Sequence, residues 1–395
     1  MRFLKSVENQ TLLAILLAVF VGLYSPGFSS KLALVGDIFL RLLKMIIAPL
    51  ILASVYGSVS GLGSISQVKN LGVKTLIYYL GTTSLAVLTG LLMVNLFQPG
   101  HQLESLFQGP EIQVQGLTLR DLILGLIPEN PVKSVAEGEV LPIIFFALAF
   151  GLATLSLPEA RKKLLFDFFE ALNEALITLI RWIVRLTPFG VFAIVAGIVA
   201  EKGLTPLLQL SSYVLTVVCG LTFHAFLTLG GLLFFLARTN PLQYFLRVRE
   251  ALLVAFSTAS SSATLPISLE IAEEKAGIPK KVAGFVLPLG ATINMDGTAL
   301  YEAVAAMFIA NLYGIALNLG QQVLIFLTAT LASIGAAGIP SAGLVTMTLV
   351  LQTVGLPLEG IGLILAVDRF LDMMRTAVNV WGDLIGAKII SHLSH

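Results

Sequence analysis

Long apolar stretches dominate the chain and alternate with short polar segments. The earlier ones lie near residues 10–28, 33–62, 73–97, 141–157, 170–200 and 206–237. Each is long enough, or nearly so, to cross about 30 Å of hydrocarbon as a helix. Two later stretches, about 281–313 and 357–390, are also long but carry polar and charged side chains. The pattern predicts an all-α membrane protein with eight transmembrane helices.

Two segments do not fit as simple spans. Residues 257–264 hold six hydroxyl side chains in eight positions and run into Pro266. Residues 333–343 are nearly all small or proline, and their apolar arms, roughly 320–332 and 344–356, are too short to cross. Non-helical backbone at membrane depth is tolerated only where protein buries it or water reaches it. We expect two re-entrant helical hairpins in an inverted repeat around a central site, with ordinary Ser- or Gly-rich loops as the alternative.

Basic residues predict the orientation of the chain, because cytoplasmic loops carry an excess of Lys and Arg. In the arrangement of eight spans they fall on one side, at Arg2, Lys5, Lys69, Lys74, residues 161–163 and 238–249, Lys280, Lys281 and Lys388. We therefore expect a multi-pass protein of the cell membrane with both termini in the cytoplasm. The polar segment 99–139 is expected to be an extended extracellular loop with a short amphipathic helix.

Composition agrees with a membrane location and excludes several other classes. The chain is 56% hydrophobic and 12% charged, against about 25% charged residues in a soluble domain. A net charge of +1 gives no electrostatic case for nucleic-acid binding. The single cysteine, Cys219, excludes a disulfide framework, and four scattered histidines leave little material for a histidine metal site.

The last apolar stretch contains the most informative chemistry of the chain. Polar side chains recur there in steps of 4, 3, 4 and 4 residues, at Asp368, Asp372, Arg375, Asn379 and Asp383. At about 100° per residue they fall within an arc of roughly 80° on one helix face. A charge in the bilayer core costs from about 3 to over 10 kcal/mol, so the stripe cannot face lipid. A stripe that faces a water-filled or ligand-filled cavity indicates a transporter.

A second polar run interrupts the stretch before it. Residues 294–298, Asn-Met-Asp-Gly-Thr, favour local side-chain bonding and broken helix geometry. Unwinding exposes backbone carbonyls, which together with a carboxylate suit a dehydrated alkali cation. The serine-rich tip and the tip at 333–343 would supply amide N–H groups and helix N-termini, which attract carboxylates.

These motifs occur together in a recognisable order. They are Ser260 to Ser262, Gly290 to Thr298, the tip Ala337 to Pro340, and Asp372 to Asn379 followed by Gly382 and Asp383. In residue types and spacing they resemble the dicarboxylate/amino acid:cation symporter family, which includes animal excitatory amino-acid transporters and archaeal sodium/aspartate symporters. The resemblance runs over nearly the whole chain.

The resemblance implies a substrate site for an acidic amino acid. Arg375 would pair with the side-chain carboxylate of the substrate, a geometry that suits guanidinium. Asp372 would accept the α-ammonium with Thr376 close by, and Thr298 would contact the other end of the substrate. The α-carboxylate would be held by Asn379, Ser261 and the backbone near Gly338 and Ile339. The implied set is Ser261, Thr298, Gly338, Ile339, Gly343, Asp372, Arg375, Thr376 and Asn379.

The resemblance also implies sodium sites, with about two to three Na⁺ per substrate. One would use Asp383 with carbonyls of Gly290, Asn294 and Asn379. A second would lie between Thr292 and carbonyls of the first half of the 333–343 tip, from Ser333, Ile334 and Ala336. A third would combine Asp296 and Asn294 with hydroxyls of the third span, from Tyr79, Thr82 and Thr83. For these hydroxyls the competing interpretation is bonding to the preceding helical turn.

Three further ionisable residues receive separate expectations. Glu302 resembles the residue that carries a co-transported proton in the animal branch, with a purely hydrogen-bonding carboxyl as the alternative. His224 is expected to be a hydrogen-bonded structural residue rather than a proton carrier, and Asp368 to support Arg375. Relatives carry an additional arginine at one of two positions that are Ala259 and Met373 here, which leaves substrate preference and potassium counter-transport open.

The function implied is symport of L-glutamate or L-aspartate with Na⁺, and with H⁺ as a further candidate. The resemblance implies a homotrimer and elevator-like alternating access. The static scaffold would comprise residues 1–68 (helices 1–2) and 99–205 (the extracellular loop and helices 4–5). The mobile transport domain would comprise residues 69–98 (helix 3) and 206–395 (helices 6–8 and both hairpins).

Other functions stay open at this point. A C4-dicarboxylate:cation symporter would leave Asp372 without an ammonium to pair with, and a proton-only glutamate symporter would make Glu302 central. A channel conflicts with closed hairpins over a site. An intramembrane aspartyl protease conflicts with Trp381-Gly382-Asp383, which lacks the Gly-x-Gly-Asp context, so we expect no enzymatic activity.

Overall fold

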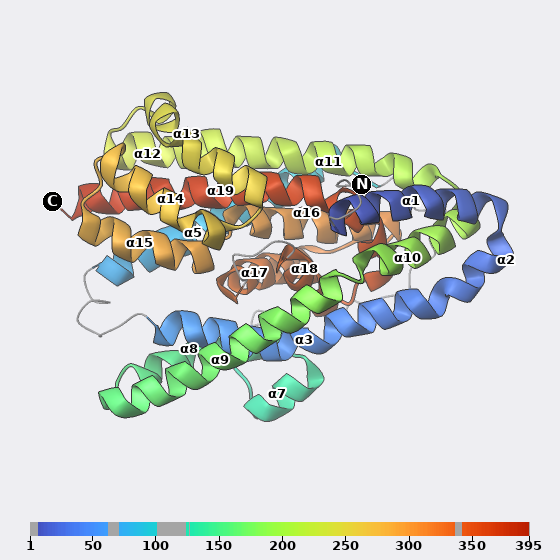
Figure 1. Ribbon diagram of the computed structural model, residues 1–395, viewed down its shortest axis with the longest axis horizontal. Helices are drawn as coiled ribbons and strands as arrows, with labels where there is room; N and C mark the ends of the chain where they lie inside the picture. Colours follow the sequence, from blue (N-terminus) through green and yellow to red (C-terminus); the bar gives the residue numbers. More distant parts are fainter. Residues whose placement is uncertain (1–6, 62–70, 101–123, 126, 336–341, 395) are drawn as a thin grey trace.

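The computed structural model describes residues 7–61, 71–100, 124–125, 127–335 and 342–394. Every regular element in these residues is helical, as the apolar pattern predicts (Figure 1). Ala336, Gly338 and Ile339, which were assigned to ion and substrate binding, lie outside the described residues. The same holds for most of the polar segment 99–139, in which the described part includes a short helix at its end.

The helices follow the predicted apolar stretches closely. The first part of the chain forms α1 (Val7–Tyr24), α2 (Pro26–Ser29), η2 (Ser30–Leu32), α3 (Ala33–Ser60), α5 (Val73–Phe97), α7 (Pro131–Glu137), α8 (Val140–Thr154), α9 (Glu159–Val184) and α10 (Thr187–Lys202). The second part forms α11 (Thr205–Phe223), the π-helical turn η5 (His224–Leu229), α12 (Gly230–Ala237), α13 (Pro241–Thr258), α14 (Ser261–Glu274), α15 (Lys280–Ile293), α16 (Asp296–Leu312), α17 (Leu319–Gly335), α18 (Ala342–Thr353), η6 (Leu358–Gly360) and α19 (Ile361–Leu393).

Among the described residues, three helical stretches are long and apolar enough to span a membrane. They are Pro26–Ser60, Val73–Phe97 and Leu207–Ala237. A fourth span is formed if α9 and α10 count as one, although they bend by 50° where they meet. The arrangement of eight spans and two re-entrant hairpins therefore stays a prediction, because length and composition alone do not identify the remaining spans.

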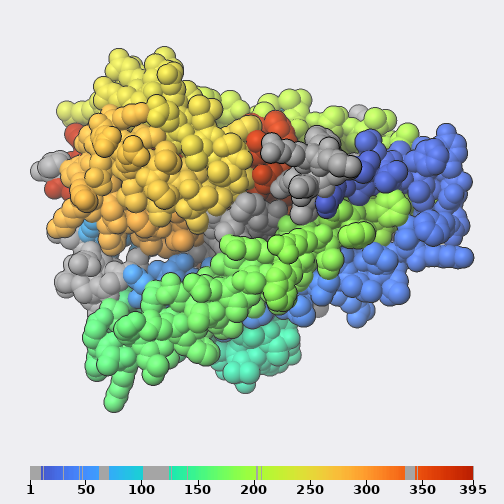
Figure 2. Space-filling model, in the orientation of Figure 1, coloured from blue at the N-terminus to red at the C-terminus, as the bar shows by residue number. Residues whose placement is uncertain are grey.

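The helices pack in two groups. In one, α1 packs against α10, and α3 packs against α8 and α9. In the other, α16 packs against α5 and α19, while α11 and α13 to α15 surround α19. In Figure 1, α9 and α10 follow each other along a diagonal across the molecule, whereas α11, α16 and α19 lie side by side. Figure 2 shows the yellow and orange atoms of α13 to α15 above the green atoms of α9 and α10.

The serine-rich segment forms the turn between two packed helices. Helix α13 ends at Thr258 and α14 begins at Ser261, and the two helices pack against each other. Ala259 adopts a left-handed conformation with φ of 50°, which lets the chain reverse direction over two residues. The Ser260 side chain then accepts a hydrogen bond from the Ala263 amide at 3.1 Å and so caps α14. The serines therefore start a helix rather than a flexible loop.

The polar run at 294–298 breaks the helix over a shorter length than predicted. The chain is non-helical only at Asn294 and Met295, and Asp296 already begins α16. An acidic residue in the first turn is favourable because it faces the positive end of the helix dipole. The backbone N–H of Gly297 donates to Asn379 Oδ1 at 2.8 Å, which satisfies one of the free amides at the helix start.

Candidate substrate and cation sites

The predicted polar stripe lies on one long helix, α19, and faces the interior of the protein. All of its members are buried: Asp368, Asp372, Arg375, Asn379 and Asp383. Buried charges are tolerated only where partners or ligands compensate them. The side chains around the stripe therefore decide which part of it is structural and which part is free to bind a ligand.

Arg375 is fully buried and only partly paired. Its Nη2 lies 2.8 Å from Asp372 Oδ1 and 3.1 Å from Asp368 Oδ1, and its Cζ lies 3.8 Å from the centre of the Tyr301 ring. Its Nε and Nη1 have no hydrogen-bond partner among the residues that the structure describes. A Cβ at position 343 would lie 2.9 Å from Nη1, so Gly343 leaves room beside it. The guanidinium therefore keeps N–H groups that can donate hydrogen bonds to a further carboxylate.

Asn379 joins the start of α16 to the stripe. Besides accepting from the Gly297 amide, it places its Nδ2 3.3 Å from Thr298 Oγ1. A Cβ at Gly297 would lie 2.5 Å from the carbonyl oxygen of Arg375, so glycine is needed for this close approach of two backbones. The predicted substrate residues Thr298, Arg375 and Asn379 are thus brought together by direct contact between α16 and α19.

Two other predicted substrate residues are buried on helices that pack against each other. Ser261 is the first residue of α14, and Thr376 follows Arg375 on α19. Helix α14 packs against α19. The first turn of a helix carries free amide groups that favour an anion. Because Gly338 and Ile339 lie outside the described residues, Gly343 is the one predicted substrate residue of segment 333–343 that the structure describes.

Asp383 forms the centre of one predicted cation site. Its Oδ1 accepts a hydrogen bond from Asn294 Nδ2 at 2.9 Å, and this amide also lies 3.3 Å from the carbonyl of Asn379. A Cβ at Gly290 would collide with the carboxylate and with the Tyr79 hydroxyl. No Lys or Arg in the described ranges forms an ion pair with Asp383. A buried carboxylate without a balancing charge, next to carbonyl oxygens, fits a hard cation such as Na⁺.

Asp296 gathers the hydroxyls of α5 at a second position. Its Oδ1 accepts from Thr83 at 2.8 Å and from Thr82 at 3.2 Å, and Thr82 also lies 3.4 Å from Asn294 Oδ1. Its Oδ2 lies 3.2 Å from His224 Nε2. The predicted grouping of Asp296, Asn294, Thr82 and Thr83 is present, and all of these oxygens suit an alkali cation. The histidine was expected to be hydrogen-bonded, but its partner was not predicted.

Three hydroxyl groups at the predicted sodium sites donate to backbone carbonyls. The Tyr79 hydroxyl donates to Val286 at 2.8 Å, that of Thr292 to Leu289 at 3.0 Å, and that of Ser333 to Thr330 at 2.7 Å, whereas the predicted ligand of Ser333 is its backbone carbonyl. Helices α15 and α17, which carry Thr292 and Ser333, are in contact. Of Ile334 only the helical backbone is described, and Ala336 is not. The structure thus describes only part of the residue set predicted for the sodium site between Thr292 and segment 333–343.

Glu302 is fully buried on α16, two turns of helix away from the polar break. Its Oε1 accepts a hydrogen bond from Thr346 of α18, while its Oε2 has no partner in the described part of the chain. Thr346 was not predicted, because nothing in the sequence pairs a threonine of α18 with a glutamate 44 positions away. The Glu302 carboxyl thus has one oxygen held by a hydroxyl donor and one oxygen that can carry a proton.

The residues around Arg375 were identified only in part from the sequence. Asp368 was expected to support Arg375, and its contact with Nη2 confirms this. Tyr301, which stacks on the guanidinium and donates to Asp368 at 2.8 Å, was not singled out for either contact. Tyr301 directly precedes Glu302 in the sequence, and this position beside a candidate proton carrier is the signal that could have singled it out.

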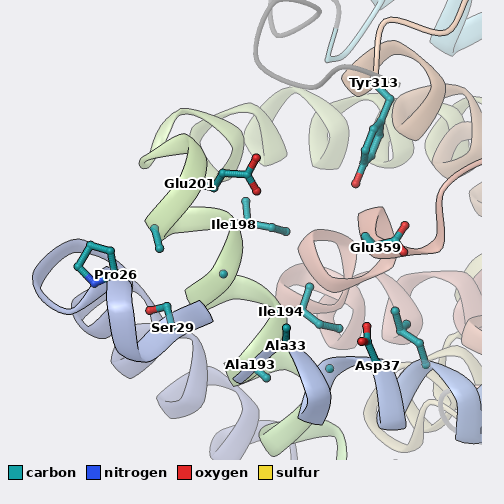
Figure 3. A pocket seen from close by; sticks show the side chains of 14 residues that line it. Pro26, Ser29, Ala33, Asp37, Ala193, Ile194, Ile198, Glu201, Tyr313 and Glu359 are labelled. Carbon is teal, nitrogen blue, oxygen red and sulfur yellow. The ribbon is translucent and has the colours of Figure 1, made fainter. Parts of the chain in front are cut away.

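A cavity elsewhere in the described residues does not suit the same substrate. A space of about 660 Å³ opens between α2, α3 and α10 on one side and the segments at Tyr313 and Glu359 on the other (Figure 3). Its charged lining residues are Asp37, Glu201 and Glu359. Carboxylates without a basic neighbour in the lining would repel an acidic amino acid. Unlike this cavity, the stripe on α19 includes a buried cation, Arg375, that complements a carboxylate.

Comparisons with known proteins agree with the resemblance seen in the motifs. A model of the sodium:dicarboxylate symporter family matches residues 8–393. The chain is 40% identical to excitatory amino acid transporter 2 of Homo sapiens, over 93% of this chain and 74% of that protein. It is 38% identical to the proton/sodium-glutamate symport protein of Geobacillus stearothermophilus, over 95% of this chain and 90% of the relative.

A third relative has almost the same length. The chain is 36% identical to the proton/glutamate-aspartate symporter of Escherichia coli strain K12, over 99% of this chain and 93% of the relative. The family model matches nearly the whole chain, so the similarity extends over all of the described helices and is not confined to one segment. The chain belongs to the sodium:dicarboxylate symporter family.

Proposed function

We propose that the protein is a secondary active transporter that takes up L-glutamate or L-aspartate together with Na⁺. The observation that carries this proposal is the environment of Arg375. A fully buried guanidinium keeps N–H donors beside Gly343, while Asp372 lies at the same place to accept an ammonium group. An acidic amino acid carries both complementary groups, a carboxylate and an ammonium. The relatives named as glutamate and aspartate symporters support the same substrate class.

Energetics favour more than one coupling ion. An acidic amino acid with one negative charge is opposed by an inside-negative potential at about 2.3 kcal/mol per 100 mV. One Na⁺ cancels this electrical term, and a tenfold sodium gradient adds only about 1.4 kcal/mol. The separate oxygen clusters at Asp296 and Asp383 would each take a sodium ion as co-substrate. Binding of sodium and substrate would then be coupled reciprocally.

We propose an elevator-like movement between the two groups of helices. The scaffold would contain α1, α3 and α8 to α10, and the mobile unit would contain α5 and α11 to α19. Two cavities, of about 660 and 560 Å³, are lined by residues of both groups, including Glu359 beside α10 and Ser262 beside α3. Space at this boundary supports a sliding motion. Eight spans with two re-entrant hairpins, a homotrimer, and a cell membrane location with cytoplasmic termini complete the proposal.

The direct test is uptake of radiolabelled L-glutamate and L-aspartate into proteoliposomes, with and without an inward sodium gradient. We expect accumulation that requires sodium. Accumulation driven by a pH gradient without sodium would replace this proposal with proton-only symport. Transport of succinate or malate in preference to both amino acids would replace it with C4-dicarboxylate symport, which the family's name also allows.

Glu302 provides a prediction about proton coupling. Glu302→Gln keeps an oxygen that can accept from Thr346 but cannot exchange a proton. We expect the variant to take up glutamate at a rate that no longer responds to an imposed pH gradient, while wild-type uptake changes severalfold. The measurement is initial uptake at fixed sodium with the inside and outside pH set independently. An unchanged response to the pH gradient would leave Glu302 as a hydrogen-bonding residue only.

A further inference from the structure

The sixth apolar stretch contains an irregular turn beside the Asp296 cluster. Helix α11 ends at Phe223, and the next residues, His224 to Leu229, form a π-helical turn before α12. A π-turn is rare, and one extra residue in the turn changes where the side chains around it point. The indole N–H of Trp381 on α19 donates to the carbonyl of Ala225 in this turn at 2.9 Å. The irregular turn is thus held by the helix that carries the polar stripe.

The first residue of the turn is directed into the interior. The His224 side chain is fully buried, and its Nε2 lies 3.2 Å from Asp296 Oδ2. A carboxylate offers no hydrogen, so Nε2 carries the hydrogen of this bond. The other ring nitrogen, Nδ1, has no partner among the residues that the structure describes. Contact with Asp296 is therefore the only hydrogen bond that the described surroundings give to this buried imidazole.

The two oxygens of Asp296 have different surroundings. Oδ1 accepts from Thr82 and Thr83 of α5, whereas Oδ2 faces His224 and a glycine of α19, Gly382. A Cβ at Gly382 would lie 3.2 Å from Oδ2, so a larger residue there would crowd the contact. The histidine and the hydroxyls hold opposite sides of one carboxylate. The hydroxyl side, which also reaches Asn294, is the side with several oxygens to offer a cation.

We propose that His224 is a positioning residue for the cation site at Asp296. It fixes Oδ2 so that Oδ1 stays among the oxygens of Thr82, Thr83 and Asn294. The π-turn and its bond from Trp381 set the place of the imidazole. Loss of a residue that hydrogen-bonds and orients an ion-coordinating side chain commonly changes the ion affinity by about 10- to 100-fold. The inference rests on the proposed function, because the cation it concerns is the co-transported Na⁺.

The test measures sodium binding without substrate, so that it does not depend on transport. The melting temperature of the purified protein is measured at increasing NaCl concentrations, with choline chloride keeping the ionic strength constant. The sodium midpoint is the sodium concentration that gives half of the maximal rise in melting temperature. His224→Leu removes the donor at similar size, and His224→Gln restores an N–H near the position of Nε2. His392→Gln, at an exposed site on α19, is the matched control.

We expect His224→Leu to raise the sodium midpoint at least about tenfold, and His224→Gln to return it to within about threefold of wild type. His392→Gln should leave it unchanged. Equal sodium midpoints for wild type and His224→Leu would overturn the proposed role of His224 and would leave the proposed function standing. Lower melting temperatures for both variants without any change in sodium midpoint would also overturn it, by showing a structural role only. No stabilisation of the wild type by sodium would overturn the proposed function, and with it the site.

Discussion

Replacing Arg375 with alanine is expected to abolish sodium-driven uptake of L-glutamate and L-aspartate, with a loss of at least about 100-fold. Truncating one partner of a buried hydrogen-bonded charge pair costs about 2 to 5 kcal/mol. Here two buried carboxylates, those of Asp368 and Asp372, would both lose the guanidinium that contacts them. The measurement is initial uptake by proteoliposomes, normalised to the amount of folded protein by size-exclusion chromatography.

Two further variants separate the possible causes of such a loss. Arg375→Lys keeps a positive charge but cannot stack on Tyr301 or offer several N–H groups in one plane, so we expect it to stay at least about tenfold impaired. Arg369→Gln, on the same helix and only half-buried, should retain uptake. Near-normal glutamate uptake by Arg375→Ala would show that Arg375, Asp372 and Asp368 form a structural ion network and that the substrate binds elsewhere.

The helices could be predicted where hydrophobicity alone determines them. The stretch expected at 33–62 matches α3 (Ala33–Ser60), and that at 73–97 matches α5. The expected span at 170–200 is instead divided between α9 and α10, with a bend of 50°. Pro188 at the start of α10 lacks the N–H that would continue the hydrogen bonding of α9. A hydrophobicity pattern does not register such a break.

Irregular turns inside a helix were not predictable for a similar reason. The π-helical turn at His224–Leu229 adds one residue to a turn and leaves the apolar character of the segment unchanged. The break at 294–298 was predicted, because Asn, Asp and Gly compete with helical hydrogen bonding. Its shorter extent reflects a tertiary contact, since Asn379 of α19 satisfies the amide of Gly297. Local sequence cannot report a cap that comes from another helix.

In the candidate site, too, residues that share one helix were predictable, whereas contacts between helices were not. The stripe on α19 follows from spacing along one helix, so its members could be identified from sequence and are all buried in the structure. Contacts between helices could not be identified in this way. Thr346 beside Glu302, Tyr301 on Arg375 and His224 at Asp296 join residues on different elements. Packing, rather than periodicity, brings these pairs together.

Replacing Asp383 with asparagine is expected to weaken sodium binding, so that the sodium concentration needed for uptake rises at least about 100-fold. This rise corresponds to the loss of about 3 kcal/mol, which one buried charge interaction supplies. Asp383 is buried beside Gly290 and accepts from the Asn294 amide. The asparagine oxygen can still accept this hydrogen bond, so the fold should survive. What is lost is the negative charge that compensates the bound cation.

The same substitution should change thermal stability in a direction that identifies the cause. Without sodium, the carboxylate is a buried charge with no cationic partner among the described residues, whereas an amide costs less to bury. Asp383→Asn should therefore be as stable as wild type, or more stable, in choline chloride. Sodium at 100 times its dissociation constant stabilises a protein by about 2.7 kcal/mol, and we expect this gain in the wild type to shrink strongly in the variant.

Asp167→Asn is the matched control, because Asp167 lies at an exposed position on α9 and pairs only with Lys163 in the described surroundings. It should keep the wild-type sodium dependence in both uptake and thermal stability. A sodium response in Asp383→Asn equal to that of this control would remove Asp383 from the cation sites. Because Asp296 lies in a separate oxygen cluster with Thr82 and Thr83, the remaining sodium dependence would then be assigned to that cluster.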